Sequence, residues 1–167
     1  VGLLRAEYAD VYAELLREGA AEMRFGDDLP PTITDFVPEP ADDDLVMLAC
    51  NTASSEALRR LQAEYASTPQ KKVIGVLVPF AEAAAEVTQN GVVGVMATRA
   101  TVHSGAYERE IKKINPDIRV VQQACPLLVP LIESGNHTSA EAGNAIESYV
   151  RPLMMQGVDT IVLGCTH

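Results

Sequence analysis

Short apolar runs alternate with longer amphipathic segments along most of the chain. The apolar runs predict strands over 45–49, 73–77, 92–97, 118–121 and 160–163. Helical patterns between them predict a helix that begins after Ser54 or Ser55 and carries Leu58, Leu61 and Tyr65, and further helices near 80–88, 104–114, 127–133 and 139–156. Because the strands lack polar alternation and are separated by helices, the pattern predicts a parallel sheet covered on both faces. The predicted fold class is α/β.

The first 44 residues follow a different pattern. Apolar residues at helical spacing over 3–18, followed by Gly19, predict an amphipathic helix. From Gly26 to Asp44, four prolines and an Asp triplet predict a long irregular connection. Loops of this length are unusual inside a compact domain, so this one is expected either to be functional or to mark an altered lobe.

Composition and charge narrow the classes of function. The 167 residues carry a net charge of −10 and no run of Lys or Arg, which argues against nucleic acid as a partner, since that binding requires clustered positive charge. The longest uncharged apolar stretches, 73–81 and 124–132, are about half the roughly 20 residues that span a bilayer, so we expect no membrane partner. The N-terminus lacks the features of a signal peptide. We therefore expect a cytoplasmic protein in which cysteines are free thiols.

Two of the three cysteines occupy matching positions. Cys50 and Cys165 each follow a predicted strand after one small residue, and polar residues follow each of them. These polar residues are Asn51 and Thr52 in the first segment, and Thr166 and His167 in the second. Parallel sheets bind ligands at the carboxyl ends of their strands. A single cysteine at such a place is most often structural, but two in matching contexts favour a functional pair.

A pair of thiols facing one carbon atom from opposite sides suits racemisation. One thiol removes a proton as the thiolate, and the other returns a proton to the opposite face as a neutral acid. Threonines and backbone amides at helix starts would hold carboxylates and stabilise the carbanion. This chemistry needs no cofactor and no metal. Two alternatives stay open. Cys50, Cys165 and His167 could hold a metal ion, although their spacing matches no zinc motif. Cys165 could instead form a nucleophilic pair with His167.

The two cysteine segments also carry a family resemblance. They read Ala49-Cys50-Asn51-Thr52-Ala53-Ser54 and Leu163-Gly164-Cys165-Thr166-His167. Both strongly resemble the signature segments of glutamate racemases, within the aspartate/glutamate racemase superfamily. Residues 74–76, 94–104 and 124–133 are similar to intervening family segments in the same order, so the resemblance covers about 45–167. It implies two pseudo-symmetric lobes, with parallel sheets flanked by helices and the active site in the cleft between them. We expect the lobes at 1–77 and 78–167.

The resemblance implies a cofactor-independent racemase that interconverts L- and D-glutamate, the D isomer being used for peptidoglycan. It implies that Cys50 removes the α-proton from the D isomer and Cys165 from the L isomer, with help from His167 and Glu133. The substrate contacts that it implies are Asn51, Thr52, Thr98, Thr101, Thr166 and His167. A His after Cys-Thr favours glutamate over aspartate as substrate. Glutamate is thus the expected small-molecule partner, and a homodimer is a candidate assembly.

Structural roles are also available for several of these residues. Thr98, Thr101 and Ser104 have the pattern of a helix cap. Glu133, near a helix end, has the character of a solvated charge. The remaining cysteine is interpreted as structural and two histidines as surface residues: Cys125, His103 and His137.

The sequence departs from the family at both ends. Residues 1–44 carry neither the Asp-Ser-Gly nor the Pro-Tyr-Gly segment of the family, and the chain ends at His167, where the family continues with Tyr-Pro. We therefore expect an incomplete or divergent first lobe. Two alternatives follow: a catalytically inactive domain that binds a small dicarboxylate, and a related racemase such as one that acts on aspartate.

Overall fold

The structure, a computed structural model, describes residues 45–68 and 72–167. Its elements are β1 (Leu45–Leu48), α2 (Asn51–Glu64), β2 (Lys72–Gly75), α3 (Leu77–Val87), β3 (Val92–Ala97), α4 (Arg99–Ser104), α5 (Ala106–Ile114), β4 (Arg119–Ala124), α6 (Leu128–Glu133), α7 (Ala140–Met155) and β5 (Thr160–Gly164). The helix predicted over 3–18 and the irregular connection over 26–44 lie outside the described residues.

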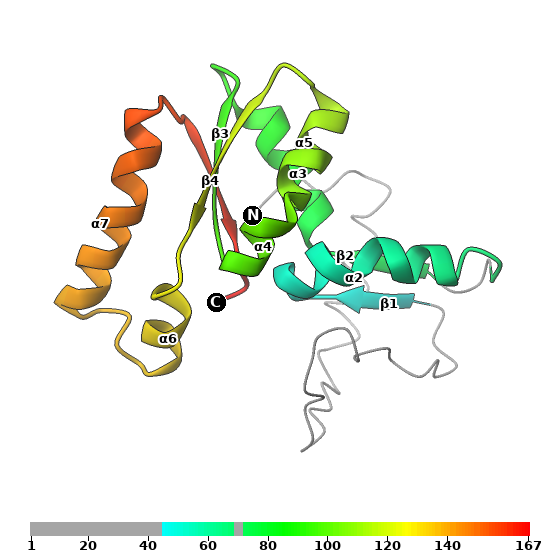
Figure 1. Ribbon diagram of the computed structural model, residues 1–167, viewed down its shortest axis with the longest axis horizontal. Helices are drawn as coiled ribbons and strands as arrows, with labels where there is room; N and C mark the ends of the chain where they lie inside the picture. The colour runs from blue at the N-terminus through cyan, green and yellow to red at the C-terminus, as the bar shows by residue number, and fades with distance from the viewer. Residues whose placement is uncertain (1–44, 69–71) are drawn as a thin grey trace.

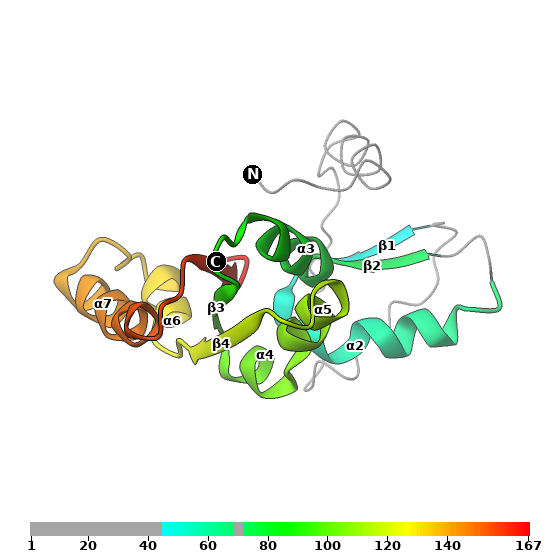
Figure 2. The same ribbon diagram turned by 90° about the horizontal axis from the view of Figure 1, so that it is seen from above.

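The strands form two parallel sheets. β1 pairs with β2, and the larger sheet has the order β4-β3-β5 with β3 in the centre. Figure 1 shows α7 on one face of the larger sheet and α3 and α5 on the other. Figure 2 shows β1 and β2 side by side at the opposite end of the molecule from α6 and α7. The predicted α/β class, with parallel sheets flanked by helices, is confirmed.

Each sheet is held by its own apolar core. The smaller sheet packs against α2, whose Leu58 and Leu61 are buried with Leu48 and Val73 of the strands. The core between the larger sheet and helices α3 and α5 contains Leu77, Ala81, Val93, Val95, Tyr107, Ile111 and Val162. Burial of apolar side chains in these cores is the main force that aligns the strand ends.

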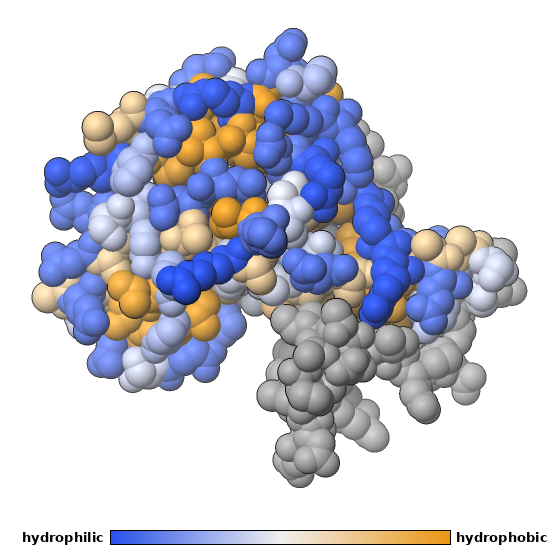
Figure 3. Space-filling view, in the orientation of Figure 1, coloured by the Kyte–Doolittle hydropathy of each residue, from blue (hydrophilic) through white to orange (hydrophobic). Residues whose placement is uncertain are grey.

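One face of β5 departs from the expectation of a sheet covered on both faces. Side chains alternate between the faces of a strand, and Val162 is buried while Leu163 is 67% exposed and Ile161 is 38% exposed. The side chains on this face of β5 are therefore uncovered in the part of the chain that the structure describes. Apolar patches interrupt an otherwise largely hydrophilic surface, one of them over α6 (Figure 3).

The start of α2 differs from the sequence prediction. The helix begins at Asn51, with Cys50 at the N-cap, rather than after Ser54 or Ser55. Neither serine caps it: the Ser54 hydroxyl donates to the Leu48 carbonyl, and the Ser55 hydroxyl donates to the Thr52 carbonyl. The serine prediction was wrong because Ser54 is buried against the sheet, where its hydroxyl needs a partner of its own.

The helix predicted over 104–114 is also different in the structure. Its residues form α5, which begins at Ala106, and a helix that was not predicted, α4, precedes it. The two helices meet at Gly105, whose φ of 63° lies in the left-handed region that favours glycine. This turn ends α4 and lets α5 start in a new direction. Thr98, Thr101 and Tyr107 are thereby placed on two short elements near the end of β3.

Candidate active site

Cys50 lies exposed at the junction of β1 and α2. The next residue, Asn51, is only 2% exposed and begins the helix. The connection is tight because a Cβ on Gly75 would lie 2.8 Å from the Ser54 hydroxyl, so this part of α2 packs directly against the end of β2. Cys50 is therefore exposed to solvent, whereas the next side chain, Asn51, is buried in the protein.

The second cysteine segment forms a chain of three groups at the end of β5. Cys165 Sγ lies 3.4 Å from His167 Nδ1, and His167 Nε2 bonds to a carboxylate oxygen of Glu133, the last residue of α6. Because an ionised carboxylate only accepts, Nε2 carries the hydrogen, which leaves Nδ1 to accept the thiol proton. The arrangement of thiol, imidazole and carboxylate suits removal of a proton from Cys165.

The Glu133 side chain is 62% exposed, which agrees with its expected solvation, yet it also has a partner in His167. Thr166, between Cys165 and His167, is exposed. The close approach of Sγ to Nδ1 gives geometric support to a Cys165–His167 pair, and Glu133 is the group that orients the imidazole.

Three threonines from two helices meet through their hydroxyls. Thr52 Oγ1 lies 2.9 Å from Thr98 Oγ1 and 3.1 Å from Thr101 Oγ1, and the last two hydroxyls are 3.1 Å apart. Thr98 also caps α4 by accepting from the backbone N–H of Thr101, so the predicted cap is confirmed for Thr98, whereas Thr101 and Ser104 lie within the helix. Each hydroxyl has one proton to donate, so the three hydroxyls can donate to one another. The same hydroxyls could instead donate to a carboxylate.

Tyr107 is a residue that the sequence reasoning missed. It is fully buried, its hydroxyl donates to Asn51 Oδ1 at 2.5 Å, and a Cβ on Gly164 would lie 2.9 Å from its ring atom Cε2. Burial, and secondarily the charge of Cys165, raises the pKa of Tyr107 above its usual value, so the hydroxyl remains a donor. The sequence signal, Tyr107 and Ile111 at helical spacing, indicates a core residue and nothing more.

The remaining candidates have plainer surroundings. Cys125 is 5% exposed, and burial raises its pKa to about 11, which agrees with a structural role. His103 and His137 are exposed, as predicted.

Across 45–68 and 72–167, no group of three His, Cys, Asp or Glu side chains is placed to hold a metal ion. No helix within these ranges is long and apolar enough to cross a membrane.

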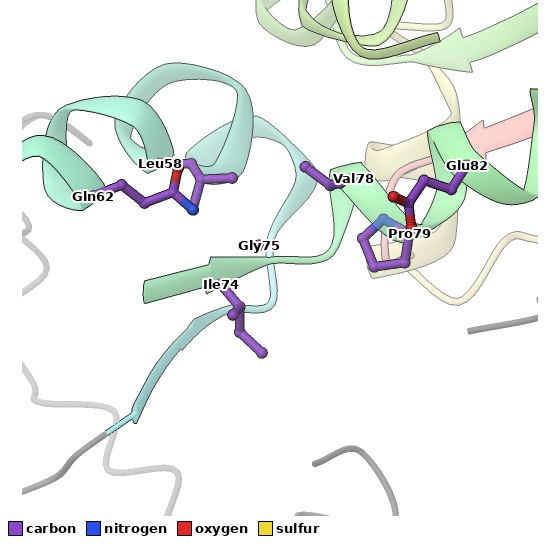
Figure 4. A pocket seen from close by; sticks show the side chains of 7 residues that line it. All are labelled: Leu58, Gln62, Ile74, Gly75, Val78, Pro79 and Glu82. Carbon is purple, nitrogen blue, oxygen red and sulfur yellow. The ribbon is translucent and has the colours of Figure 1, made fainter. Parts of the chain in front are cut away.

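A small pocket lies away from the predicted site residues, between α2, β2 and α3 (Figure 4). Its lining includes Leu58, Ile74, Pro79 and Glu82 and none of the residues predicted to contact substrate or to catalyse. The chemistry-bearing side chains gather instead around the ends of β1, β3 and β5.

These residues define an α/β protein with one thiol that is not buried, Cys50 or Cys165, at the carboxyl end of each of two parallel sheets. The chain belongs to the Asp/Glu/hydantoin racemase family, which matches residues 9–167. The resemblance drawn from the two cysteine segments is thus confirmed.

Several relatives of this chain carry the name glutamate racemase. The one from Geobacter metallireducens is 44% identical over 153 residues, which cover 88% of this chain and 55% of the relative. The solved glutamate racemase from Bacillus anthracis is 34% identical with a TM-score of 0.67, over 74% of this chain and 45% of that one. The Francisella tularensis enzyme, solved in complex with D-glutamate, is 32% identical with a TM-score of 0.66 over the same shares. The chain spans about half the length of the curated relatives that it matches.

Proposed function

We propose that the protein interconverts L- and D-glutamate without a cofactor, in the cytoplasm, and supplies D-glutamate for peptidoglycan. Relatives named glutamate racemase, one of them holding D-glutamate, support this substrate. Free thiols at Cys50 and Cys165 support a reducing compartment, because the proposed chemistry requires both thiols unoxidised.

One observation carries the proposal: both cysteine segments contact the same side chain, Tyr107. Asn51, next to Cys50, bonds to Tyr107, and the Tyr107 ring packs against Gly164, next to Cys165. The residues next to the two cysteines therefore lie on either side of Tyr107, although 114 residues lie between Cys50 and Cys165 in the chain. This arrangement supports a site that reaches one carbon atom from two sides.

In the proposed reaction, one cysteine acts as thiolate and the other as thiol. The thiolate takes the α-proton, the electron pair stays on the α-carbon, and the opposite thiol donates its proton to the other face. Each turnover leaves the protonation states of Cys50 and Cys165 exchanged. His167 Nδ1 would accept the proton of Cys165 when that residue has to act as the base, and Glu133 would stabilise the resulting imidazolium.

Substrate binding is assigned to hydrogen-bond donors around the two thiols. The hydroxyls of Thr52, Thr98 and Thr101 would turn from one another to a substrate carboxylate. Asn51 Nδ2, a buried donor without a partner, supports a second contact, and Thr166 and His167 complete the set. Fixed donors of this kind stabilise the negative charge that develops as the α-proton leaves.

We also propose that the lobes divide near residue 77, with 1–77 in the first and 78–167 in the second. The separation of β1 and β2 from the sheet β4-β3-β5 supports this division, as does the start of α3 at Leu77. A homodimer is tested by light scattering on the purified chain, where a mass of about 36 kDa, twice the 17.9 kDa of one chain, would support it.

The function is tested by proton NMR in deuterium oxide. L- and D-glutamate are incubated separately with the full chain, and loss of the α-proton signal is followed. We expect loss from both isomers in wild type. Cys50→Ser should abolish exchange of the D isomer and Cys165→Ser should abolish exchange of the L isomer, and either change should abolish net racemisation, because a serine hydroxyl has far too high a pKa to replace a thiolate.

The matched control is Cys125→Ala, which removes the third thiol from a separate buried cluster and should leave exchange intact. Full exchange by Cys165→Ser would refute the mechanism. Calorimetric binding of glutamate by a folded chain that exchanges neither isomer would instead identify an inactive dicarboxylate-binding domain. Faster exchange of aspartate than of glutamate would identify a related racemase.

A further inference from the structure

Tyr107 contacts both cysteine segments with different parts of one side chain. Its hydroxyl donates to Asn51, which follows Cys50, and its ring packs against Gly164, which precedes Cys165. The side chain is fully buried, so neither contact competes with bulk water. A phenylalanine would make the ring contact with Gly164 equally well. The hydroxyl therefore contributes only the hydrogen bond to Asn51.

The hydrogen bond to Tyr107 decides how the Asn51 carboxamide is oriented. A carboxamide has an acceptor side and a donor side, and rotation by 180° exchanges them. The Tyr107 hydroxyl must place its own proton on an acceptor, which draws Oδ1 toward α5. Nδ2 is then left on the other side.

The donor side of Asn51 is unsatisfied. Asn51 is 98% buried, and its Nδ2 is one of two buried side-chain polar atoms that have no hydrogen-bond partner in the described ranges. A buried donor without a partner is unfavourable and uncommon in folded proteins. Such a group beside Cys50 indicates that an acceptor comes from a ligand.

We propose that Tyr107 is a positioning residue of the racemase site, whose hydroxyl holds the Asn51 carboxamide so that Nδ2 is directed to a carboxylate of the substrate. This inference rests on the proposed function for the identity of the ligand. Tyr107 itself does not touch the reacting atoms. It acts through Asn51, and its ring at the same time fixes the distance between the strand end before Cys165 and the helix start after Cys50.

The test compares Tyr107→Phe with wild type in the α-proton exchange assay. Phenylalanine keeps the ring against Gly164 and removes only the hydroxyl. We expect KM for both isomers to rise about tenfold while kcat changes less than about threefold, because a contact to a carboxylate is present in the ground state and in the transition state alike. A purely structural role would lower the folded fraction and hence the apparent kcat, and would leave KM unchanged.

Tyr149→Phe is the matched control. The change at this half-buried tyrosine of α7 also removes a hydroxyl with a hydrogen bond, one that accepts from the backbone N–H of Leu127, but Tyr149 packs in a different apolar cluster from Tyr107. Its KM should equal that of wild type. The double variant Asn51→Ala/Tyr107→Phe should have the same KM as Asn51→Ala alone, because the hydroxyl acts only through Asn51.

A second readout does not depend on turnover. In nitrogen-15 NMR spectra of the full chain, D-glutamate should shift the side-chain amide signals of Asn51 in wild type and much less in Tyr107→Phe. A wild-type chain that shows this shift but exchanges neither isomer would refute the proposed function and leave the positioning role standing. Unmoved Asn51 signals in wild type, an unchanged KM in Tyr107→Phe, or additive effects in the double variant would overturn the positioning role.

Discussion

Replacement of Gly164 by alanine tests the packing that places Cys165. The added Cβ would lie 2.9 Å from Tyr107 Cε2, 3.0 Å from Ala97 Cβ and 3.3 Å from the backbone oxygen of Met96. Real Cβ atoms are essentially never closer than 3.0 Å to a neighbour, and none of these three atoms is the end of a flexible side chain. The end of β5 therefore has to move away from β3 and α5.

The magnitude follows from the cost of overpacking a close-packed interior. One extra methyl group in such a site costs about 1–3 kcal/mol. For a chain of this size each kcal/mol corresponds to roughly 2–4 °C in the melting temperature. We therefore expect Gly164→Ala to unfold about 2–12 °C below wild type. Its α-proton exchange should fall as well, because Cys165 is the next residue along the strand end that has to move.

Gly143→Ala, in the helix α7, is the matched control because the same methyl group is added where no atom lies within 4 Å apart from the neighbouring residues and backbone of the helix itself. Alanine replaces glycine in a helix interior with a gain of about 0.5–1 kcal/mol, so this variant should be slightly more stable than wild type. Thermal unfolding followed by circular dichroism measures both. A Gly164→Ala protein as stable as the Gly143→Ala protein, with full exchange activity, would refute the packing argument.

Three further predictions follow from single groups. Cys125 should be the last of the three thiols to react with iodoacetamide at pH 8, since burial raises its pKa to about 11, and mass mapping that shows equal rates would contradict this. Hydrogen bonds, first from the backbone of Asn90, lower the pKa of Asp159 from 3.8 to about 2, so its stabilising effect is present above pH 3.8 and lost as the pH falls through about 2. The melting-temperature difference between wild type and Asp159→Asn should therefore shrink from pH 7 to pH 2, and a constant difference would count against this assignment. Arg59→Met removes the 2.6 Å ion pair with Glu110 between α2 and α5. It should lower the free energy of unfolding, measured with denaturant, by less than about 1 kcal/mol, and by less still in high salt. A larger loss would show that solvent does not screen this pair.

The order of elements was predictable because it depends on short-range patterns. Apolar runs of four to six residues located all five described strands, and Thr98 at the start of α4 was recognised as a cap from its neighbours alone. Cys50 and Cys165 could be placed at strand ends for the same reason. Gly105 shows the limit of such patterns, since its left-handed conformation separates α5 from α4, a short helix that the pattern did not predict.

The site itself depends on contacts between residues that are far apart in the chain. The bond between Tyr107 and Asn51 spans 56 residues, and the bond between His167 and Glu133 spans 34. Local propensity and periodicity hold no information about such pairs, because they form only when two sheets and their helices pack in one particular way. The sequence by itself therefore determined the fold class, the family resemblance and the two thiols. Only the tertiary structure decided which residues surround them, because burial brought the Tyr107 hydroxyl to Asn51 Oδ1, the acceptor that it needs.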